Sequence, residues 1–401
     1  MIGAIDRPFF KFICLSRGSM RIALVASPFI SVPPSHYGGT ELFIAQLATG
    51  LKEQGFDVVV YANGESKLDV EVRWLYEKGE WPIQGELYAS VKDMNHTAWA
   101  VRDAWDDADI MHVNNVPGIS FSRFNGPEFV YTIHHPHCDE LTEFYSYYPR
   151  VQFVSISRFQ QRTESMPRIR TIHHGVDIDS YCCVSKKQDY LCFLGRIAPM
   201  KGTHLAIEVA KRSGIPLKIA GEVQPIYREY FETQIKPNVD GKFIEYLGPA
   251  NLEAKNELLG NALAMLFPIQ WNEPFGLVMI EAMATGTPVI ALPGGAVEEV
   301  IQEGVSGHIC GNMDEMVQTI RDLPGKYSPE KLREYVLRYF SVDRMVRDYA
   351  ALYREIVPDI REMVSLAENS LSVEHPLTAD EFVTDEVEGF EDDPEEPQAV
   401  A

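Results

Sequence analysis

Two glutamates in one apolar stretch are the residues with the clearest chemical potential. Glu273 and Glu281 lie eight positions apart, and the segment after Gly276 is apolar except for Glu281. Such a segment predicts a helix that is buried on nearly every side. Because an unpaired charge is costly in that environment, Glu281 is expected to have a partner, such as a pair of hydroxyl groups or a cation.

The start of the same helix is a second place where chemistry is expected. The segment Phe275–Leu277 opens the helix, Gly286 and Pro288 end it, and Glu273 lies just before it. Free backbone N–H groups and the positive end of the helix dipole favour an anion there. The pattern favours a polyhydroxyl ligand that carries phosphate. A core helix with one ion-paired glutamate is the alternative that this stretch leaves open.

Two cations occupy a glycine-containing loop earlier in the chain. Arg196 and Lys201 lie five positions apart, and Gly195 and Gly202 flank them. Glycine lets a backbone approach a ligand closely, and two cations at the end of a strand could clamp a diphosphate through charge-assisted hydrogen bonds. A solvated basic turn is the alternative interpretation.

A glycine pair follows the first predicted strand. Gly38 and Gly39 lie between that strand and the next helical pattern. In open α/β sheets, ligands bind at this carboxyl edge of the strands. The pair is therefore a candidate for ligand contact, and a tight turn is the alternative.

A histidine-rich loop follows another predicted strand, and it contains His134, His135, His137 and Cys138. The spacing HHxHC matches no standard zinc site. Loops at strand ends often carry function. We therefore predict a polar loop with one working histidine, and no metal site.

The composition argues against several classes of function. The formal net charge is −22, from 36 basic and 58 acidic residues, which argues against charge-driven binding to nucleic acid or to anionic membranes. No apolar run reaches the length of a membrane span. The six cysteines contain no CxxC pair, and they predict reduced thiols in a cytoplasmic protein.

Strand-like and helical segments alternate through the first half of the chain. Strands are predicted at residues 21–27, 57–62, 109–113, 129–133, 152–155 and from 169 onward. A strand, loop, helix and strand in succession imply parallel pairing and a right-handed crossover. The sequence lacks GxGxxG, so it has no dinucleotide fingerprint.

The same pattern restarts in the second half. Strands are predicted at residues 191–194, 217–220, 243–247, 264–268 and 289–292, with Glu222 just after the second of them. We therefore predict an α/β fold of two Rossmann-like, doubly wound domains that face a central cleft. The predicted domains are residues 20–180 and 190–340, joined by a linker at 181–189.

The ends of the chain are expected to differ from the domains. Residues 1–19 are predicted to form a disordered extension. Residues 341–366 form a helical pattern, which is expected to cross back to the first domain. From Glu374 onward there are eleven acidic residues and no lysine or arginine, so residues 367–401 are predicted to form a disordered acidic tail.

Five motifs occur in the order known from one enzyme family: ISVPPSHYGGTE at 30–41, TIHH at 132–135, LGRIAPMKG at 194–202, EPFGLVMIE at 273–281 and GGAVEEV at 294–300. Over residues 20–357 the chain resembles the retaining, nucleotide-sugar-dependent glycosyltransferases of family 4. The resemblance implies the GT-B fold. HHGVD at 173–177 stands where the family usually has an NGVD-like turn, so His174 replaces the usual asparagine.

The resemblance implies a role for each matching residue. Arg196 and Lys201 bind the donor diphosphate and stabilise the leaving group. Glu281 binds the ribose hydroxyls, Glu273 contacts the transferred sugar, and His134 lines the reaction centre. Further donor contacts are implied for Gly38, Gly39, Glu222 and the backbone N–H groups of Phe275, Gly276 and Leu277.

The implied reaction moves a hexosyl group, with retention, from a nucleotide sugar to a hydroxyl acceptor. A UDP-hexose is the most frequent donor in the family, and no metal or other cofactor is required. The acidic charge favours a soluble acceptor. A retaining phosphorylase on the same fold and a non-catalytic nucleotide-sugar-binding protein are the alternatives.

Overall fold

A computed structural model describes residues 19–35, 38–83 and 85–357. The extension expected at 1–19 lies outside these residues except for Ser19, and the tail expected at 367–401 lies outside them entirely. Both sheets of the protein belong to one compact unit that ends at Val357. Among the described residues, no helix combines the length and the apolar character needed to cross a membrane.

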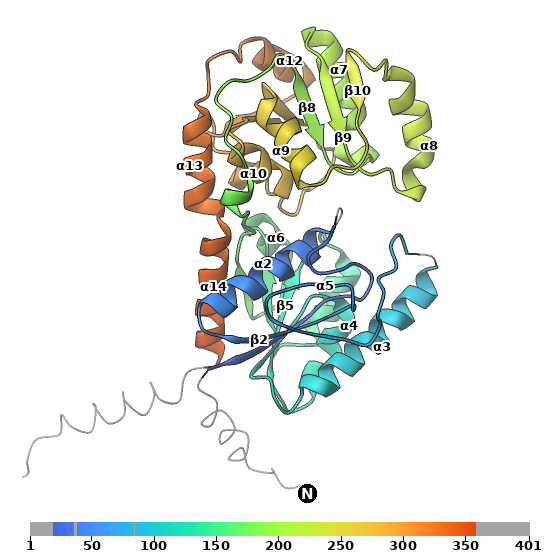
Figure 1. Cartoon of the computed structure of the whole chain (residues 1–401), viewed down its shortest axis with the longest axis vertical. Helices are drawn as coiled ribbons and strands as arrows, with labels where there is room; N and C mark the ends of the chain where they lie inside the picture. Colours follow the sequence, from blue (N-terminus) through green and yellow to red (C-terminus); the bar gives the residue numbers. More distant parts are fainter. Residues whose placement is uncertain (1–18, 36–37, 84, 358–401) are drawn as a thin grey trace, which may run out of the picture. The chain divides into compact units, whose positions relative to one another are not determined.

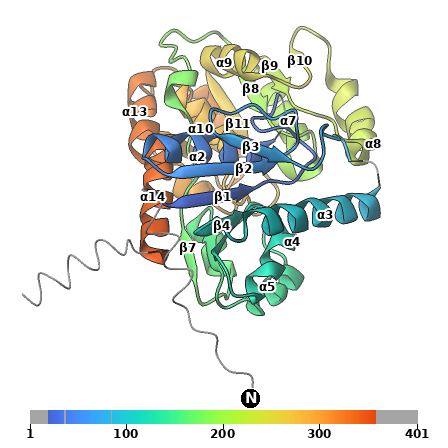
Figure 2. The same cartoon turned by 60° about the horizontal axis from the view of Figure 1, so that its bottom comes forward.

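The first domain is built on a seven-stranded parallel sheet (Figures 1 and 2). In spatial order its strands are β3 (Glu71–Trp74), β2 (Asp57–Ala62), β1 (Arg21–Val25), β4 (Ile110–Val113), β5 (Glu128–Ile133), β6 (Gln152–Ser155) and β7 (Ile169–Thr171). Its helices are α2 (Gly39–Glu53), α3 (Glu86–Ala104), α4 (Val116–Ile119), η1 (Ser120–Arg123), α5 (Asp139–Ser146) and α6 (Arg158–Thr163). Both faces of β1 are buried, which explains its continuous apolar run.

The second domain is built on a six-stranded parallel sheet, with strands β10 (Ile244–Tyr246), β9 (Leu217–Ala220), β8 (Leu191–Leu194), β11 (Ala264–Phe267), β12 (Val289–Ala291) and β13 (Gly307–Ile309). Its short helical turns are η3 (Pro199–Lys201), η4 (Pro225–Tyr227), α8 (Arg228–Tyr230), η5 (Phe231–Ile235), η6 (Lys236–Asn238) and α11 (Val297–Val300). Its longer helices are α7 (Thr203–Ser213), α9 (Leu252–Asn261), α10 (Leu277–Ala284), α12 (Met313–Arg321) and α13 (Pro329–Phe340).

The strand orders confirm the predicted pair of doubly wound α/β domains. In the first sheet the chain runs outward from β1 to β3 and returns on the other side at β4. In the second sheet it runs from β8 to β10 and returns at β11. Each sheet thus has a switch point beside its first strand, where open α/β proteins bind ligands.

Two strands, β3 and β13, are missing from the sequence prediction. Each forms one edge of its sheet, and neither has the apolar run that marks a buried strand. In β3 the side chains of Glu71 and Arg73 form an ion pair at the surface. In β13 a Cβ on Gly307 would lie 2.0 Å from the carbonyl oxygen of Val289, so close backbone packing replaces side-chain packing.

The chain crosses between the two domains at two places. The short helix η2 (Ile178–Ser180) leads from the first domain to Tyr181, which is buried in the core of the second. Near Ser341 the chain crosses back, and the N–H of Val342 donates to the carbonyl of Val176 at 3.1 Å. The two crossings therefore lie side by side.

Helix α14 (Val342–Ile356) belongs to the first domain although it follows the second. It packs beside α2 in both views (Figures 1 and 2). A Cβ on Gly50 of α2 would lie 2.6 Å from Val346, so the glycine permits this close approach. The helix was expected over 341–366, of which residues 358–366 lie outside the described part.

Candidate functional site

A cavity of about 390 Å³ lies where the second sheet's strand ends meet the first domain's glycine loop. It includes residues that follow β8, β9, β10 and β11, so it covers the switch point of that sheet. Nine residues that the sequence analysis assigned to ligand binding line it: Gly38, Gly39, Arg196, Lys201, Glu222, Glu273, Gly276, Leu277 and Glu281.

Helix α10 begins at this cavity because of a glycine. Gly276 caps the helix with φ of 87°, a conformation that other residues rarely adopt. A Cβ at this position would also lie 2.6 Å from the side-chain methyl of Met279. Residues 279–284 are buried, but the helix start, with its free N–H groups, and the side chain of Glu281 both face the cavity.

Glu281 is the buried carboxylate of α10, and its two oxygens differ. Oε1 accepts hydrogen bonds from Lys255 Nζ at 2.8 Å and from the Tyr181 hydroxyl at 2.9 Å. Oε2 is buried and receives no hydrogen bond from any residue in the described part of the chain. Burial and the nearby Glu281 charge raise the pKa of Tyr181. Lys255 is thus the cation that the apolar surroundings of Glu281 require.

Glu273 forms a second ion pair on the cavity wall. Its Oε2 lies 2.5 Å from Lys201 Nζ and accepts a hydrogen bond from Trp271 Nε1 at 2.9 Å. Lys201 Nζ also lies 4.6 Å from the centre of the Trp271 ring. Glu273 is 6% exposed. The residues expected to contact diphosphate and sugar therefore form an ion pair with each other.

The loop after β8 holds the two predicted cations in place. Gly202 has φ of 73°, and a Cβ there would lie 1.9 Å from the carbonyl oxygen of Pro268. The backbone N–H of Ile197 donates to the carbonyl of Glu222 at 3.0 Å, which ties the loop to the one after β9. Arg196 and Lys201 consequently line the same wall.

A carboxylate oxygen at the end of β9 also lacks a partner. Oε2 of Glu222 is buried and receives no hydrogen bond from the residues that the structure describes. Glu222 lines the cavity together with Asn251 at the start of α9. The cavity thus offers unsatisfied acceptors from Glu222 and Glu281 and cations from Arg196 and Lys201.

The first domain contributes the glycine loop before α2. A Cβ on Gly39 would lie 3.5 Å from Leu277 at the start of α10, so the glycine lies close to the second domain. Gly38 has φ of 147°, and a Cβ there would lie 2.8 Å from Glu41 Oε2. Burial raises the pKa of Glu41 to about 7.

His134 and Phe275 do not belong to the residues that line the cavity. His134 Nε2 lies 2.9 Å from Asn114 Oδ1, and its ring stacks on His174 with centroids 5.7 Å apart. His174 in turn meets Phe275 edge to face. Burial holds the pKa of His134 well below its usual range and lowers that of His174 to about 3.

The other residues of the histidine loop hydrogen-bond within the first domain. His135 Nε2 lies 2.6 Å from the Tyr145 hydroxyl, and His137 lies 3.1 Å from Glu164 and 2.9 Å from Asp139. In the described part of the chain, no group of three or more His, Cys, Asp or Glu side chains could hold a metal ion.

The sequence analysis missed three residues that bond to Glu273 or Glu281: Tyr181 and Lys255 line the cavity, and Trp271 lies beside it. Tyr181 was assigned to the linker, Lys255 lies in a segment with no motif, and Trp271 was given no role. The only sequence signal was the apolar setting of Glu281, which predicts a partner but does not identify it.

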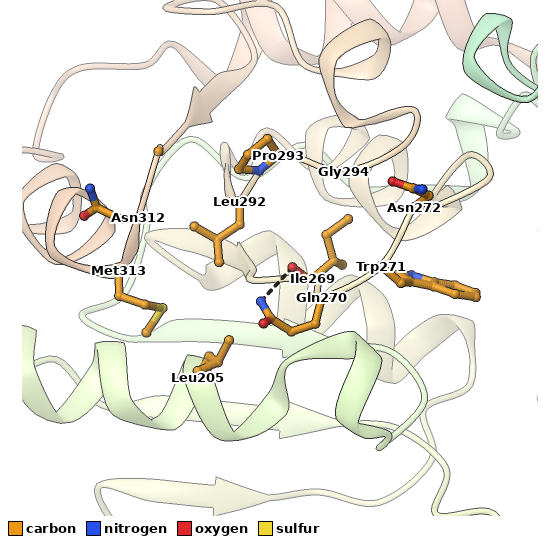
Figure 3. Close-up of a pocket in the computed structure, with 11 residues that line it drawn as sticks. Leu205, Ile269, Gln270, Trp271, Asn272, Leu292, Pro293, Gly294, Asn312 and Met313 are labelled. Atoms are coloured by element: carbon orange, nitrogen blue, oxygen red, sulfur yellow. Dashed lines mark hydrogen bonds between the residues drawn. The ribbon is translucent and has the colours of Figure 1, made fainter. Parts of the chain in front are cut away.

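A second cavity, of about 690 Å³, lies in the second domain (Figure 3). It lies beside the loops after β11, β12 and β13, and Trp271 is part of its wall. Figure 3 shows the Gln270 amide turned back to the carbonyl of Ile269, at 2.9 Å. Trp271 bonds to Glu273, so the loop 269–273 contributes residues to both cavities.

Two protein-family models match the chain. The family "Glycosyltransferase Family 4" matches residues 37–180, and "Glycosyl transferases group 1" matches residues 184–336. The two matches cover the first and the second domain.

Curated relatives match over shorter stretches. N-acetyl-alpha-D-glucosaminyl L-malate synthase from Bacillus anthracis is 34% identical over 26% of this chain and 29% of that protein. D-inositol 3-phosphate glycosyltransferase from Mycolicibacterium smegmatis is 30% identical over 37% of each. The putative glycosyltransferase YtcC from Bacillus subtilis is 24% identical over 51% of this chain and 59% of that protein. The chain thus matches between about a third and three fifths of these relatives' length.

Solved structures share the fold across both domains. Sucrose-phosphate synthase from Thermosynechococcus elongatus superposes with a TM-score of 0.70 at 17% identity, over 84% of this chain and 99% of that one. Anabaena HepE, in complex with UDP and glucose, superposes with 0.66 at 17%, over 84% and 100%. AviGT4, a glycosyltransferase involved in avilamycin A biosynthesis, superposes with 0.62 at 23%, over 84% and 98%. The fold is therefore GT-B, and with both domains matched, the chain belongs to glycosyltransferase family 4.

Proposed function

We propose that the protein is a retaining glycosyltransferase that moves a hexosyl group from a nucleotide sugar to a hydroxyl acceptor. The observation that carries the proposal is the meeting of four features on one cavity. These are the cations Arg196 and Lys201, the start of α10, and the buried carboxylate of Glu281. Cations and a helix start suit a diphosphate, and a buried unsatisfied carboxylate oxygen suits hydroxyl groups.

The diphosphate is proposed to bind between the two cations and the start of α10. Breaking the bond between the anomeric carbon and the phosphate oxygen leaves negative charge on the departing diphosphate. Charges that are already fixed toward that oxygen stabilise the transition state more than the ground state. Arg196, Lys201 and the backbone N–H groups of Gly276 and Leu277 would supply that stabilisation.

Glu273 is proposed to contact the transferred sugar. Its carboxylate is paired with Lys201. A bound diphosphate would compete for the Lys201 ammonium, and the Glu273 carboxylate would then be available to the sugar hydroxyls. The acceptor would attack on the face from which the diphosphate leaves, and the departing phosphate oxygen would take its proton. This route requires no protein base.

His134 is proposed to act near the reaction centre as a neutral group. Its lowered pKa means that the ring carries no charge at neutral pH. Because Nε2 donates to Asn114 Oδ1, the other ring nitrogen, Nδ1, carries no proton in the neutral ring and could only accept a hydrogen bond.

The donor is proposed to be a UDP-hexose, and the acceptor a soluble molecule in the cytoplasm. The complex of Anabaena HepE with UDP and glucose, a protein of the same fold, supports this donor class. The formal net charge of −22 supports a soluble acceptor, because it disfavours docking on anionic membranes.

A thermal-shift panel of UDP-, GDP- and ADP-sugars, followed by transfer assays, tests the proposal. A ligand at about 100 times its Kd adds about 2.7 kcal/mol of stability. We expect one donor class to raise Tm, and we expect Arg196→Ala and Lys201→Ala to lose both the shift and the transfer. Lys211→Ala, an exposed cation on α7, is the control. Unchanged transfer by both site variants would refute the diphosphate assignment.

Glu273→Gln separates binding from transfer in the same assays. The amide keeps the size of the side chain but loses its charge, so nucleotide should bind normally while transfer falls. Full activity would remove Glu273 from the site. Release of a sugar phosphate with inorganic phosphate alone would identify a phosphorylase, and tight nucleotide binding without any turnover would identify a binding protein.

A further inference from the structure

The two oxygens of the Glu281 carboxylate differ in the hydrogen bonds that they accept. Oε1 accepts from Lys255 at 2.8 Å and from Tyr181 at 2.9 Å. Oε2 is buried and without a hydrogen bond from the described residues. A carboxylate can accept about two hydrogen bonds at each oxygen. Oε1 is therefore saturated, and Oε2 has room for two donors.

The pair is largely buried, and hydrogen bonds tie the segments around it. The Glu281 side chain is 3% exposed and that of Lys255 is 22% exposed. Lys255 lies in the first turn of α9, which Asn251 caps by accepting from the N–H of Ala254 at 2.9 Å. The carbonyl of Tyr181 accepts from Arg333 on α13 at 2.6 Å. Lys255 thus lies on a capped helix, and Tyr181 is anchored through its backbone to α13.

We propose that Lys255 and Tyr181 are positioning residues, which hold Oε1 of Glu281 so that only Oε2 is presented to the two neighbouring hydroxyls of the donor's ribose. The inference rests on the proposed function, because the ribose is that of a nucleotide sugar. It adds that the site selects ribonucleotides over deoxynucleotides. A nucleotide that lacks either hydroxyl leaves the buried, charged Oε2 with one hydrogen bond fewer, which is costly.

A purely structural role of the ion pair is the competing explanation. In that case Lys255 and Tyr181 only compensate a buried charge, and their loss would weaken the binding of every nucleotide equally. The two explanations differ in one measurable quantity. This is the ratio of the Kd of a deoxynucleoside diphosphate to that of the matching ribonucleoside diphosphate.

The experiment measures that ratio by calorimetry on the full chain. The probes are UDP, GDP and ADP, each with its 2′-deoxy and 3′-deoxy counterpart. For the base that binds, we expect each missing hydroxyl to weaken binding about tenfold. Equal binding of the three forms would overturn this inference alone. Failure of every nucleoside diphosphate to bind would overturn the proposed function as well.

Variants then connect the ratio to the two positioning residues. Lys255→Met keeps the length of the side chain but loses the ammonium, and Tyr181→Phe loses only the hydroxyl. Without these donors Oε1 is released and the carboxylate can turn or take up a proton. We expect the ratio to fall toward one in both variants, and to be retained in Lys255→Arg. If the Kd ratio of both Lys255→Met and Tyr181→Phe stays within about twofold of the ratio of the unchanged protein, the structural explanation is favoured and the proposal is overturned.

Matched controls exclude a general loss of stability. Lys187 is a half-buried lysine of the same domain that donates to Gly260 and Thr287, and it is not part of the cavity wall. Tyr190 donates its hydroxyl to the carbonyl of Leu258 at 2.9 Å. Lys187→Met and Tyr190→Phe are expected to lower Tm while leaving the ratio unchanged. If they lower the ratio as much as the site variants do, the proposal fails.

Discussion

The charged side chains of the cavity are arranged as pairs of opposite sign. Lys201 lies against Glu273 at 2.5 Å, and Lys255 lies against Glu281 at 2.8 Å. Pairing removes much of the penalty of burying each charge. The pairs differ in what ligand binding would do to them. A diphosphate would compete with Glu273 for Lys201 and so break the first ion pair. A ribose would donate hydrogen bonds to Glu281 and leave the second ion pair intact.

A prediction at the residue scale concerns the protonation of Glu41. Burial raises its pKa to about 7, so the folded state binds a proton that the unfolded state releases above its ordinary pKa. The free energy of unfolding therefore falls as pH rises from about 4.5 to about 7. Glu41→Gln removes this effect, and we expect its stability advantage over the unchanged protein to grow by about 2 kcal/mol between about pH 5.5 and pH 8.

Urea unfolding of both proteins across this pH range measures the effect. Glu53→Gln, an exposed glutamate on the same helix, is the control for the loss of one negative charge. A constant difference between Glu41→Gln and the unchanged protein would contradict the raised pKa.

At the scale of elements, glycines decide how closely the loops of the cavity pack. Gly202 caps α7 at its start, against the carbonyl of Pro268 after β11. Gly276 caps α10, and a Cβ on Gly295 would lie 2.2 Å from the carbonyl oxygen of Glu273. Loops that pack backbone against backbone leave no space for a side chain. The positions of Lys201 and Glu273 thus depend on neighbours that have no side chain.

The two ends of α7 allow this idea to be tested. Gly202 and Gly214 cap the helix with φ of 73° and 76°. A Cβ on Gly214 would meet no atom of the described residues within 4 Å, whereas one on Gly202 would lie 1.9 Å from the Pro268 oxygen. We expect Gly214→Ala to cost about 1 kcal/mol of stability, because of its φ alone. Gly202→Ala should cost roughly 3 kcal/mol or more, because the clash must also be relieved.

Denaturant unfolding gives the two free energies, and nucleotide binding gives a second readout. Gly202→Ala should also weaken nucleotide binding, since it displaces the loop of Lys201, while Gly214→Ala should not. Equal effects of the two substitutions on stability would show that the contact with Pro268 does not matter.

At the scale of the whole molecule, one carboxylate joins the two domains away from the cavity. Glu299 on α11 accepts from the backbone N–H groups of Arg158 and Phe159 at the start of α6, at 2.9 and 2.8 Å. His173 Nε2 lies 3.1 Å from the same carboxylate. These hydrogen bonds hold the pKa of Glu299 below its usual value although burial opposes this. Glu299 thus links α11 of the second domain to the start of α6 in the first.

Glu299→Gln tests the strength of this contact. Removing the charge weakens the two hydrogen bonds that the backbone N–H groups of Arg158 and Phe159 donate. We therefore expect the hydrogen-exchange rates of these two amides to rise about tenfold. Glu298→Gln, an exposed neighbour of equal charge, should leave the exchange unchanged. Exchange that is as slow in Glu299→Gln as in the unchanged protein would mean that α6 is protected without this carboxylate.

The sequence by itself determined the doubly wound domains and the glycine and charged motifs of the cavity wall. Strand and helix periods are local signals, and glycine and charged motifs at strand ends must meet at one edge of a parallel sheet. The tertiary structure alone decided the rest. It brings Lys255 and Tyr181 to Glu281, sets His134 behind the cavity wall, and adds the edge strands β3 and β13. These features depend on contacts between segments far apart in the chain, and no local pattern encodes which distant side chain compensates a buried charge.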